Sequence, residues 1–349
     1  MSMDASTKTL VIRFSSIGDI VLSTPLLRVL RARFPNGQID YVTRAEYAEL
    51  VKSNQNLNHT YGFDASEGFD GLRMLKKKIK DERYDLIVDV HDSLRSKYLR
   101  SLHGPKVAVV NKRLMQRSML VNFKKNVYKE VIRVADRYIE AVKDLGITND
   151  GKGLELHIPD ETLFGVSGKV AMLKLNQFEK VIGLCPGARH FTKRWPPERF
   201  ARVGAACAQK ADAKILLFGS TEDETICNQI CWDINNQAGA ERASSFCGQL
   251  GLLETAAAME YCDVVVTNDT GLMHIATAMH RKVVAIFGST VREFGFFPHD
   301  PEAVVLEHAG LDCRPCSHIG RSECPEKHFK CMLDIQPDEV YSRARALLV

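Results

Sequence analysis

Short apolar runs alternate with longer stretches of helical periodicity along most of the chain. Such alternation is typical of βαβ units built on a parallel sheet. In the first half, the apolar runs predict strands near residues 9–14, 38–43, 85–90 and 106–110. In the second half, they predict strands near residues 180–185, 213–218, 263–267 and 282–287. Helices are expected to begin near Pro196, Glu222, Leu252 and Leu272. The pattern therefore predicts two α/β halves.

An irregular stretch at 151–168, which contains Gly, Pro and Asp, separates the two halves and marks the expected domain boundary. We expect an N-terminal domain over 1–165, a C-terminal domain over 166–336 and a terminal helix over 337–349. The length agrees with two domains, since 349 residues exceed the usual reach of one core, roughly 250 to 300 residues.

A carboxylate follows the first predicted strand. Residues 9–14 form a buried apolar run, Ser15-Ser16-Ile17-Gly18 supplies a turn, and residues 20–34 carry apolar side chains on a helical period. Asp19 therefore lies at or near a helix start, where its simplest role is to accept hydrogen bonds from unpaired backbone N–H groups. The alternative is an acid or base at the carboxyl edge of the sheet, where open parallel sheets bind ligands.

The second half ends several predicted strands in small or polar residues. These joints lie at 183–189, 216–220 and 264–271. Residues 268–274 combine a small loop, a helix start and a histidine, and both free N–H groups and the helix dipole there favour a phosphate. Lys193 and Arg194 add positive charge just before a helix, a position that the dipole disfavours for solvated cations. This arrangement favours a bound anion.

Together, the Ser-Ser-Ile-Gly-Asp turn, Lys193-Arg194-Trp195-Pro196 and Asn268-Asp269-Thr270-Gly271-Leu272-Met273-His274 resemble glycosyltransferase family nine, the heptosyltransferases of lipopolysaccharide core synthesis. The resemblance spans nearly the whole chain. It implies a GT-B fold, an α/β architecture with two Rossmann-like doubly wound domains facing a cleft, whose terminal helix packs back on the first domain. It also implies an inverting, metal-independent transfer of a sugar from a nucleotide diphosphate to a lipid-linked saccharide, without a cofactor.

The resemblance also implies roles for individual residues. Asp19 matches the catalytic aspartate, the base that takes the proton of the acceptor hydroxyl. The expected donor-binding residues are Lys193, Glu222, Asp269, Thr270, Gly271 and His274. Asp269 either binds a sugar hydroxyl or caps the helix that follows it, and Asp223 and Glu224 compete with Glu222 for the ribose. ADP-heptose is the expected donor, although loop 188–192 lacks the two small hydroxyl residues that begin it in the family.

Charge is unevenly shared between the halves. Residues 1–150 hold 26 Lys plus Arg against 18 Asp plus Glu, whereas residues 151–349 hold 21 against 25. Solvated helix faces explain many of these charges. The rest predict attraction to an anionic lipid-linked acceptor at a membrane surface, with acceptor contacts from Ser16, Gly18, Lys124 and Lys125. Nucleic acid is not an expected partner, because the net charge of +4 is mild and no nucleic-acid motif accompanies it.

The expected location is the cytoplasm, with peripheral contact at the inner face of the membrane. No apolar run approaches the roughly 20 residues that span a bilayer. Residues 1–8 are polar and lack the apolar core of a secretory signal. A disulfide framework is therefore not expected among the ten cysteines.

Four of those cysteines form the pattern Cys313-x2-Cys316-x7-Cys324-x6-Cys331, with His318 and His328 between them. Paired thiolates can close a structural zinc site. Against that, the second pair is too widely spaced for a standard zinc ribbon, and the family that the chain resembles is not known to need a metal. We therefore predict no metal ligand and leave zinc as the alternative. The other six cysteines are expected in the core.

Two other functions fit the same pattern of residues. One is a nucleotide-sugar epimerase or hydrolase on a GT-B scaffold, whose phosphate site would look alike. The other is a non-catalytic nucleotide-sugar-binding protein, which the presence of Asp19 disfavours. A nicotinamide dehydrogenase is disfavoured because no Gly-x-Gly-x-x-Gly follows the first strand.

Overall fold

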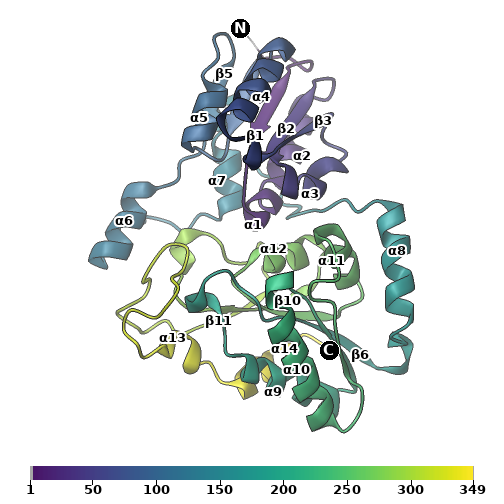
Figure 1. The fold of residues 1–349 in the computed structure, drawn as a ribbon. Coiled ribbons are helices and arrows are strands. Elements are labelled where there is room, and N and C mark those ends of the chain that lie inside the picture. Colours follow the sequence, from purple (N-terminus) through teal and green to yellow (C-terminus); the bar gives the residue numbers. More distant parts are fainter. Residues whose placement is uncertain (1–2, 349) are drawn as a thin grey trace. The chain divides into compact units, whose positions relative to one another are not determined.

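The computed structural model describes residues 3–348, which divide into two compact units (Figure 1). The first unit contains the chain up to Arg113 and Ile132–His157. The second contains Leu114–Val131 and the chain from Ile158 onward. The chain thus crosses between the units three times, and the boundary expected between residues 165 and 166 falls inside helix α8 (Asp160–Ala171).

The first unit is built on a parallel five-stranded sheet in the order β3-β2-β1-β4-β5. Its strands are β1 (Thr9–Ile12), β2 (Ile39–Arg44), β3 (His59–Phe63), β4 (Leu86–Asp89) and β5 (Lys106–Val109). Its helices are α1 (Ile17–Val21), α2 (Thr24–Arg33), α3 (Glu49–Lys52), α4 (Gly68–Glu82), α5 (Leu94–Arg100) and α7 (Val134–Glu140). The central strand β1 is fully buried, and its carboxyl end leads directly into the Asp19 turn.

The second unit is built on a parallel six-stranded sheet in the order β11-β10-β9-β6-β7-β8. Its strands are β6 (Lys180–Cys185), β7 (Ala213–Leu217), β8 (Ala243–Ser245), β9 (Val264–Asn268), β10 (Lys282–Phe287) and β11 (Val304–Glu307). Besides α8, its helices are α6 (Leu114–Phe123), α9 (Pro197–Lys210), α10 (Glu224–Ala238), α11 (Leu252–Met259), α12 (Gly271–Ala278), α13 (Lys330–Leu333) and α14 (Pro337–Ala346). Strand β9 therefore lies in the middle of this sheet and ends at the loop expected to bind phosphate.

The helix expected over residues 20–34 is divided in two. Helix α1 ends at Val21 and α2 starts at Thr24, with Pro25 in its first turn. Proline fits the first turn because its missing N–H has no partner there in any case, whereas further into a helix it clashes with the preceding turn. Because of this break, Asp19 lies in a separate short helix, α1.

Helix α14 uses its apolar face inside the second unit. Val340 and Ala344 are fully buried in the core of that unit, together with Trp195 and Phe200. The helix is therefore part of the core of the second unit, and its expected packing on the first domain stays a prediction.

The charge imbalance between the halves is smaller between the units. The first unit holds 23 Lys plus Arg against 18 Asp plus Glu, and the second holds 24 against 25. The difference shrinks because the basic residues of 114–131 belong to the second unit. Within residues 3–348, no helix has the length and apolar character that a bilayer span requires.

One expectation about the cysteines is wrong. Cys227 on α10 and Cys247 after β8 form a disulfide in the second unit, where both are fully buried. No sequence pattern pairs these two cysteines, since they are 20 residues apart and belong to no spaced motif.

Candidate functional site

Asp19 is held by four hydrogen-bond donors at the carboxyl end of β1. Arg13 lies on β1's continuation, and its Nη2 atom is 2.6 Å from Asp19 Oδ2. The Ser16 hydroxyl and backbone N–H donate to the same oxygen, at 3.0 and 3.3 Å. Tyr138 on α7 donates to Oδ1 at 3.1 Å. Asp19 thus does close the N-terminus of α1, as its simplest interpretation predicts, but this accounts for only part of its contacts.

The surroundings keep Asp19 ionised. Burial opposes ionisation of this carboxyl, but the Arg13 charge and the Ser16 hydrogen bonds outweigh it, so the pKa of Asp19 lies below its ordinary value. Burial raises the pKa of the Tyr138 hydroxyl well above its ordinary value, despite the opposing charge of Arg13. Tyr138 therefore stays a hydrogen-bond donor, and Asp19 stays a carboxylate that can accept a proton.

His91 is a further polar side chain in this region that the sequence did not indicate. It follows β4, and its ring packs edge-on against Phe14. Burial, followed by the charges of Arg13 and Lys112, lowers the pKa of His91 to about 4. Its Nδ1 atom is buried without a hydrogen-bond partner in the described part of the chain. The imidazole is therefore neutral near pH 7, and no sequence motif marks it.

The residues expected to bind the acceptor belong to different units. Ser16 contacts Asp19 directly, and Gly18 is buried within α1. Lys124 and Lys125 instead follow α6 and belong to the second unit. The Lys124 ammonium donates to the carbonyls of Cys313 and Pro315, at 3.1 and 2.6 Å. These bonds occupy a side chain that the charge pattern assigned to the acceptor.

The donor residues gather at the end of β9. The Lys193 ammonium lies 2.7 Å from Asp269 Oδ2, and this carboxylate also accepts from the Thr290 hydroxyl at 2.7 Å. Asp269 is nearly buried, with 5 % of its side chain exposed, while Lys193 retains 16 %. The buried carboxylate thus anchors a lysine whose side chain is partly exposed.

Thr270, Gly271 and His274 mark the first turn of α12. Thr270 is its N-cap residue, and Gly271 is its first helical residue. The Thr270 hydroxyl is buried and finds no hydrogen-bond partner among residues 3–348. His274 is also buried. Asp269 precedes the cap position, and its carboxylate contacts Lys193 and Thr290, so it does not cap this helix.

The three acidic residues after β7 differ in how they are used. Asp223 accepts hydrogen bonds from the Ser220 hydroxyl and backbone N–H, at 2.8 and 3.0 Å. Its carboxylate also packs so close to Gly187 that a Cβ atom there would lie 2.4 Å away. Glu222 and Glu224 are exposed. Asp223 is therefore committed to the loop, which leaves Glu222 and Glu224 available for a ligand.

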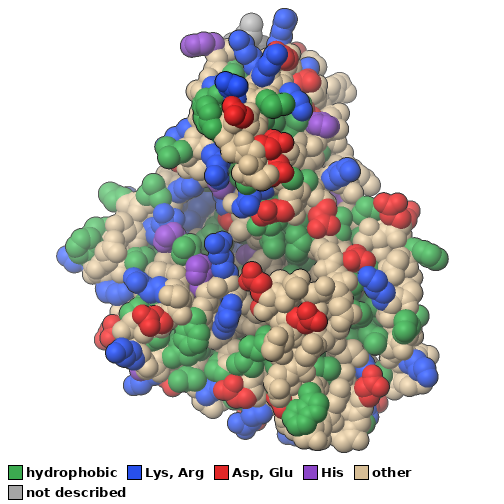
Figure 2. Space-filling view, in the orientation of Figure 1, with side chains coloured by type: hydrophobic (Ala, Val, Ile, Leu, Met, Phe, Trp, Pro, Cys, Tyr) green, Lys and Arg blue, Asp and Glu red, His purple; other side chains and the backbone are tan. Residues whose placement is uncertain are grey.

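Cationic side chains surround the Lys193 loop. Burial and the charges of Lys193, Arg189 and Arg194 lower the pKa of His190. Burial and the charges of Arg117 and Lys193 lower the pKa of His318. Figure 2 shows His side chains (purple) among Lys and Arg (blue) on the left of the second unit. The charge of Lys193 thus lowers the pKa of both His190 and His318, and the positive charges around this loop favour binding of an anion.

The cysteine-rich segment buttresses this loop. The Arg321 backbone N–H donates to the Thr192 hydroxyl at 2.8 Å, next to Lys193. Arg314 donates to the Thr290 carbonyl at 2.7 Å and pairs with Glu307 at 2.8 Å. Over the described chain, no group of three or more His, Cys, Asp or Glu side chains is arranged to hold a metal ion.

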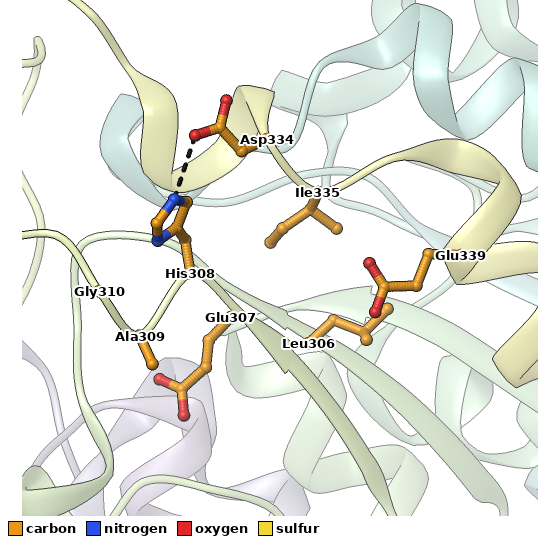
Figure 3. A pocket seen from close by; sticks show the side chains of 8 residues that line it. All are labelled: Leu306, Glu307, His308, Ala309, Gly310, Asp334, Ile335 and Glu339. Atoms are coloured by element: carbon orange, nitrogen blue, oxygen red, sulfur yellow. Dashed lines mark ion pairs between the residues drawn. The ribbon is translucent and has the colours of Figure 1, made fainter.

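A separate cavity of about 360 Å³ lies beyond the end of β11 (Figure 3). Its lining includes Glu307, His308, Asp334 and Glu339, and His308 Nε2 lies 3.2 Å from Asp334 Oδ2. None of the expected donor residues lines it. Its acidic walls make it unsuited to a diphosphate.

Two Rossmann-like units, each with polar groups at the carboxyl ends of its parallel strands, define the GT-B class, and the expected fold is confirmed by solved structures. A family 9 glycosyltransferase from Veillonella parvula superimposes with a TM-score of 0.80 at 24% identity, covering 100% of this chain and 98% of that one. ADP-heptose lipopolysaccharide heptosyltransferase II from Escherichia coli gives a TM-score of 0.73 at 25% identity, covering 98% of each chain.

Residues 72–328 match the model of glycosyltransferase family 9 (heptosyltransferase), and the chain belongs to this family. It is therefore a glycosyltransferase, as the sequence resemblance predicts. Among curated relatives, lipooligosaccharide heptosyltransferase 2 of Campylobacter jejuni is 28% identical over 95% of both chains. Lipopolysaccharide heptosyltransferase 2 of Escherichia coli is 26% identical over 98% of this chain and 99% of its own length.

Proposed function

We propose that the protein transfers heptose from ADP-heptose to the lipid A and inner-core acceptor of lipopolysaccharide, with inversion at the anomeric carbon. The names of its relatives, heptosyltransferases that it matches over nearly their full length, support this substrate class. The observation that carries the chemistry is Asp19, an ionised carboxylate fixed at the end of β1 by Arg13 and Tyr138.

In this reaction, the acceptor hydroxyl oxygen attacks the anomeric carbon while Asp19 takes its proton. The bond between that carbon and the diphosphate oxygen breaks, and ADP leaves with the bonding electrons. A carboxylate suits the role of base because it is fully ionised near pH 7 and lies at the edge of the sheet where ligands bind. A single direct displacement of this kind inverts the anomeric configuration.

The second unit would bind the donor. Lys193 offers a positive charge, and the first N–H groups of α12 offer hydrogen bonds to the diphosphate. The Thr270 hydroxyl, which has no hydrogen-bond partner among residues 3–348, would donate there as well. These donors would stabilise the charge that develops on the leaving group. We assign the ribose to Glu222; of its two competitors, Asp223 is already engaged in the loop, whereas Glu224 is exposed like Glu222. Fixed side-chain cations take the place of a divalent metal, so we expect transfer to persist in a chelator.

The acceptor is anionic, and we propose that the protein meets it at the inner face of the cytoplasmic membrane. Lys125 and Lys129, both exposed after α6, are suited to anionic headgroups, each adding about 1 kcal/mol near such a surface. Lys124 would contribute less, since carbonyls occupy its ammonium. Charge reversal in Lys125→Glu/Lys129→Glu should reduce sedimentation with anionic liposomes, and unchanged sedimentation would refute this contact.

The experiment that tests the function is transfer to deacylated inner-core lipopolysaccharide, followed by mass spectrometry, with ADP-heptose and other nucleotide sugars offered in parallel. Wild type is compared with Asp19→Asn and with Asp64→Asn, a matched control at an exposed turn of the first unit. We expect product only from ADP-heptose, a loss of about 100-fold or more in Asp19→Asn and full activity in Asp64→Asn.

Other outcomes would identify the alternatives. Consumption of ADP-heptose without an acceptor would indicate a hydrolase or epimerase. Donor binding without turnover, with every sugar and acceptor tested, would indicate a nucleotide-sugar-binding protein. Equal transfer by wild type and Asp19→Asn would remove Asp19 from the mechanism.

A further inference from the structure

The two oxygens of the Asp19 carboxylate are unequally occupied. Oδ2 accepts three hydrogen bonds, from Arg13 Nη2 and from the hydroxyl and N–H of Ser16. Oδ1 accepts one, from the Tyr138 hydroxyl. A carboxylate has about four acceptor positions, two on each oxygen. Within the described residues, Oδ2 is therefore saturated and Oδ1 has one position left.

We propose that Oδ1 is the atom that receives the acceptor proton, and that Arg13 and Tyr138 are the positioning residues that select it. The inference rests on the proposed role of Asp19 as the base. In the step, the acceptor O–H bond breaks and an Oδ1–H bond forms at the vacant position. Tyr138 keeps its own proton and continues to donate to the other position of Oδ1, while Arg13 and Ser16 keep Oδ2 occupied.

The contacts of Arg13 explain why Oδ2 of Asp19 stays occupied and Oδ1 remains the open oxygen. Its guanidinium is almost wholly buried and donates from Nη1 to the Val90 carbonyl at 2.7 Å, beyond the end of β4. The group also lies 5.7 Å from the centre of the Tyr138 ring. Strands β1 and β4 are direct neighbours, so the sheet itself fixes both ends of this bridge. Asp19 cannot turn its Oδ2 atom toward a ligand without breaking these contacts.

Arg13 also has an electrostatic role whose sign can be worked out. Burial is the largest influence on Asp19 and raises its pKa, while Arg13 is the largest opposing influence. Without the guanidinium, the largest influence that lowers the pKa of Asp19 is gone while burial still raises it, so this pKa should rise. Asp19 would then become protonated at a higher pH than in wild type, which a purely structural role of Arg13 does not predict.

The test is the pH dependence of kcat/KM for transfer with ADP-heptose, from roughly pH 4.5 to pH 9. The variants are Arg13→Met, Arg13→Lys and Tyr138→Phe. Matched controls in the first unit are Arg73→Lys, which is exposed, and Tyr98→Phe, whose ring packs against Phe69. Circular dichroism and ADP binding establish that each variant is folded.

Wild type should show no acidic limb above roughly pH 5. Arg13→Met should move the acidic limb to higher pH, with kcat/KM falling as Asp19 becomes protonated, and Arg13→Lys should return it toward wild type. Tyr138→Phe should lose about tenfold in kcat with little change in KM for ADP-heptose. Unchanged pH profiles in the Arg13 variants, or wild-type kcat in Tyr138→Phe, would overturn the inference. Full activity of Asp19→Asn would instead refute the proposed role of Asp19 as the base, on which this inference rests.

Discussion

Replacing Lys193 by methionine should destabilise the second unit as well as weaken the donor site. The change keeps the length and apolar stem of the side chain but removes its charge. Asp269 would then be a carboxylate with 5 % exposure whose single remaining side-chain donor is the Thr290 hydroxyl, as far as the described residues show. Breaking a buried ion pair from one side leaves the other charge uncompensated.

The expected cost follows from which partner is removed. Lys193→Met strands the buried charge and should cost about 3 to 5 kcal/mol. Asp269→Asn should cost less, about 1 to 2 kcal/mol, because the Lys193 side chain is 16 % exposed and thus less buried than Asp269, and because the amide still accepts from Thr290. The double variant contains no uncompensated charge. It should therefore be more stable than the sum of the single changes by about 2 kcal/mol or more.

Urea unfolding followed by tryptophan fluorescence measures this in the second unit alone. Both tryptophans of the chain, Trp195 and Trp232, belong to that unit, and Trp195 is fully buried two residues from Lys193. With a slope of about 2 kcal/mol per molar urea, Lys193→Met should lower the midpoint by about 2 M. Lys169→Met is the matched control, because its partly exposed pair with Glu254 should contribute about 1 kcal/mol or less.

Two results would refute this reasoning. A Lys193→Met midpoint equal to that of Lys169→Met would mean that Asp269 does not depend on the lysine. Strictly additive single and double variants would mean that the two charges are not coupled, and the 2.7 Å contact would then not hold Lys193 in place.

Three further predictions concern other parts of the molecule. His91 has a pKa of about 4, below the ordinary 6.5, so the unfolded chain takes up its proton first; stability should fall by up to about 3 kcal/mol as the pH drops from 6.5 toward 4. His91→Gln should remove that loss in unfolding titrations followed by circular dichroism, and equal losses would contradict it. Glu222→Gln should raise KM for ADP-heptose about tenfold and leave the melting temperature unchanged. Asp223→Asn should lower the melting temperature, because the amide caps the Ser220 turn less well than the carboxylate does. A raised KM in Asp223→Asn and a lowered melting temperature in Glu222→Gln would mean that the two roles are exchanged. Reduction of the Cys227–Cys247 disulfide, which closes a 20-residue separation, should destabilise the second unit by about 3 kcal/mol in urea titrations with and without reductant.

The sequence predicts the centre of each sheet far better than its edges. All eight apolar runs correspond to strands, including β1 and β9. The three unpredicted strands are β3, β8 and β11, each of which has one neighbour in its sheet. Strand β3 reads His-Thr-Tyr-Gly-Phe, with one buried residue, and β8 reads Ala-Ser-Ser. A strand at an edge need not be apolar on both faces, so it lacks the continuous run that reveals a central strand.

Sequence patterns could not predict which unit residues 114–131 belong to, and the reason is different. Residues 114–131 contain a helix of ordinary composition, and nothing in their periodicity states which core they join. Lys124 illustrates the consequence. Its charge was counted with the first half, but its ammonium is bound by carbonyls 189 and 191 residues further along. Such long-range backbone contacts depend on three-dimensional placement alone.

In the candidate site, too, some residues could be predicted from the local sequence and others could not. Asp19, Lys193 and Asp269 could be identified because each sits in a short segment at a strand end, and segments of this kind persist in the linear sequence. Arg13, His91 and Tyr138 could not, because they meet only where β1, β4 and α7 come together. Arg13 is a lone cation after an apolar strand. Tyr138 is one of several buried residues in the seven-residue helix α7. In the proposed mechanism, Arg13 and Tyr138 decide which oxygen of the Asp19 carboxylate is open to the acceptor. A sequence can therefore indicate a candidate reacting group, while the groups that set its ionisation and orientation become visible only in the fold.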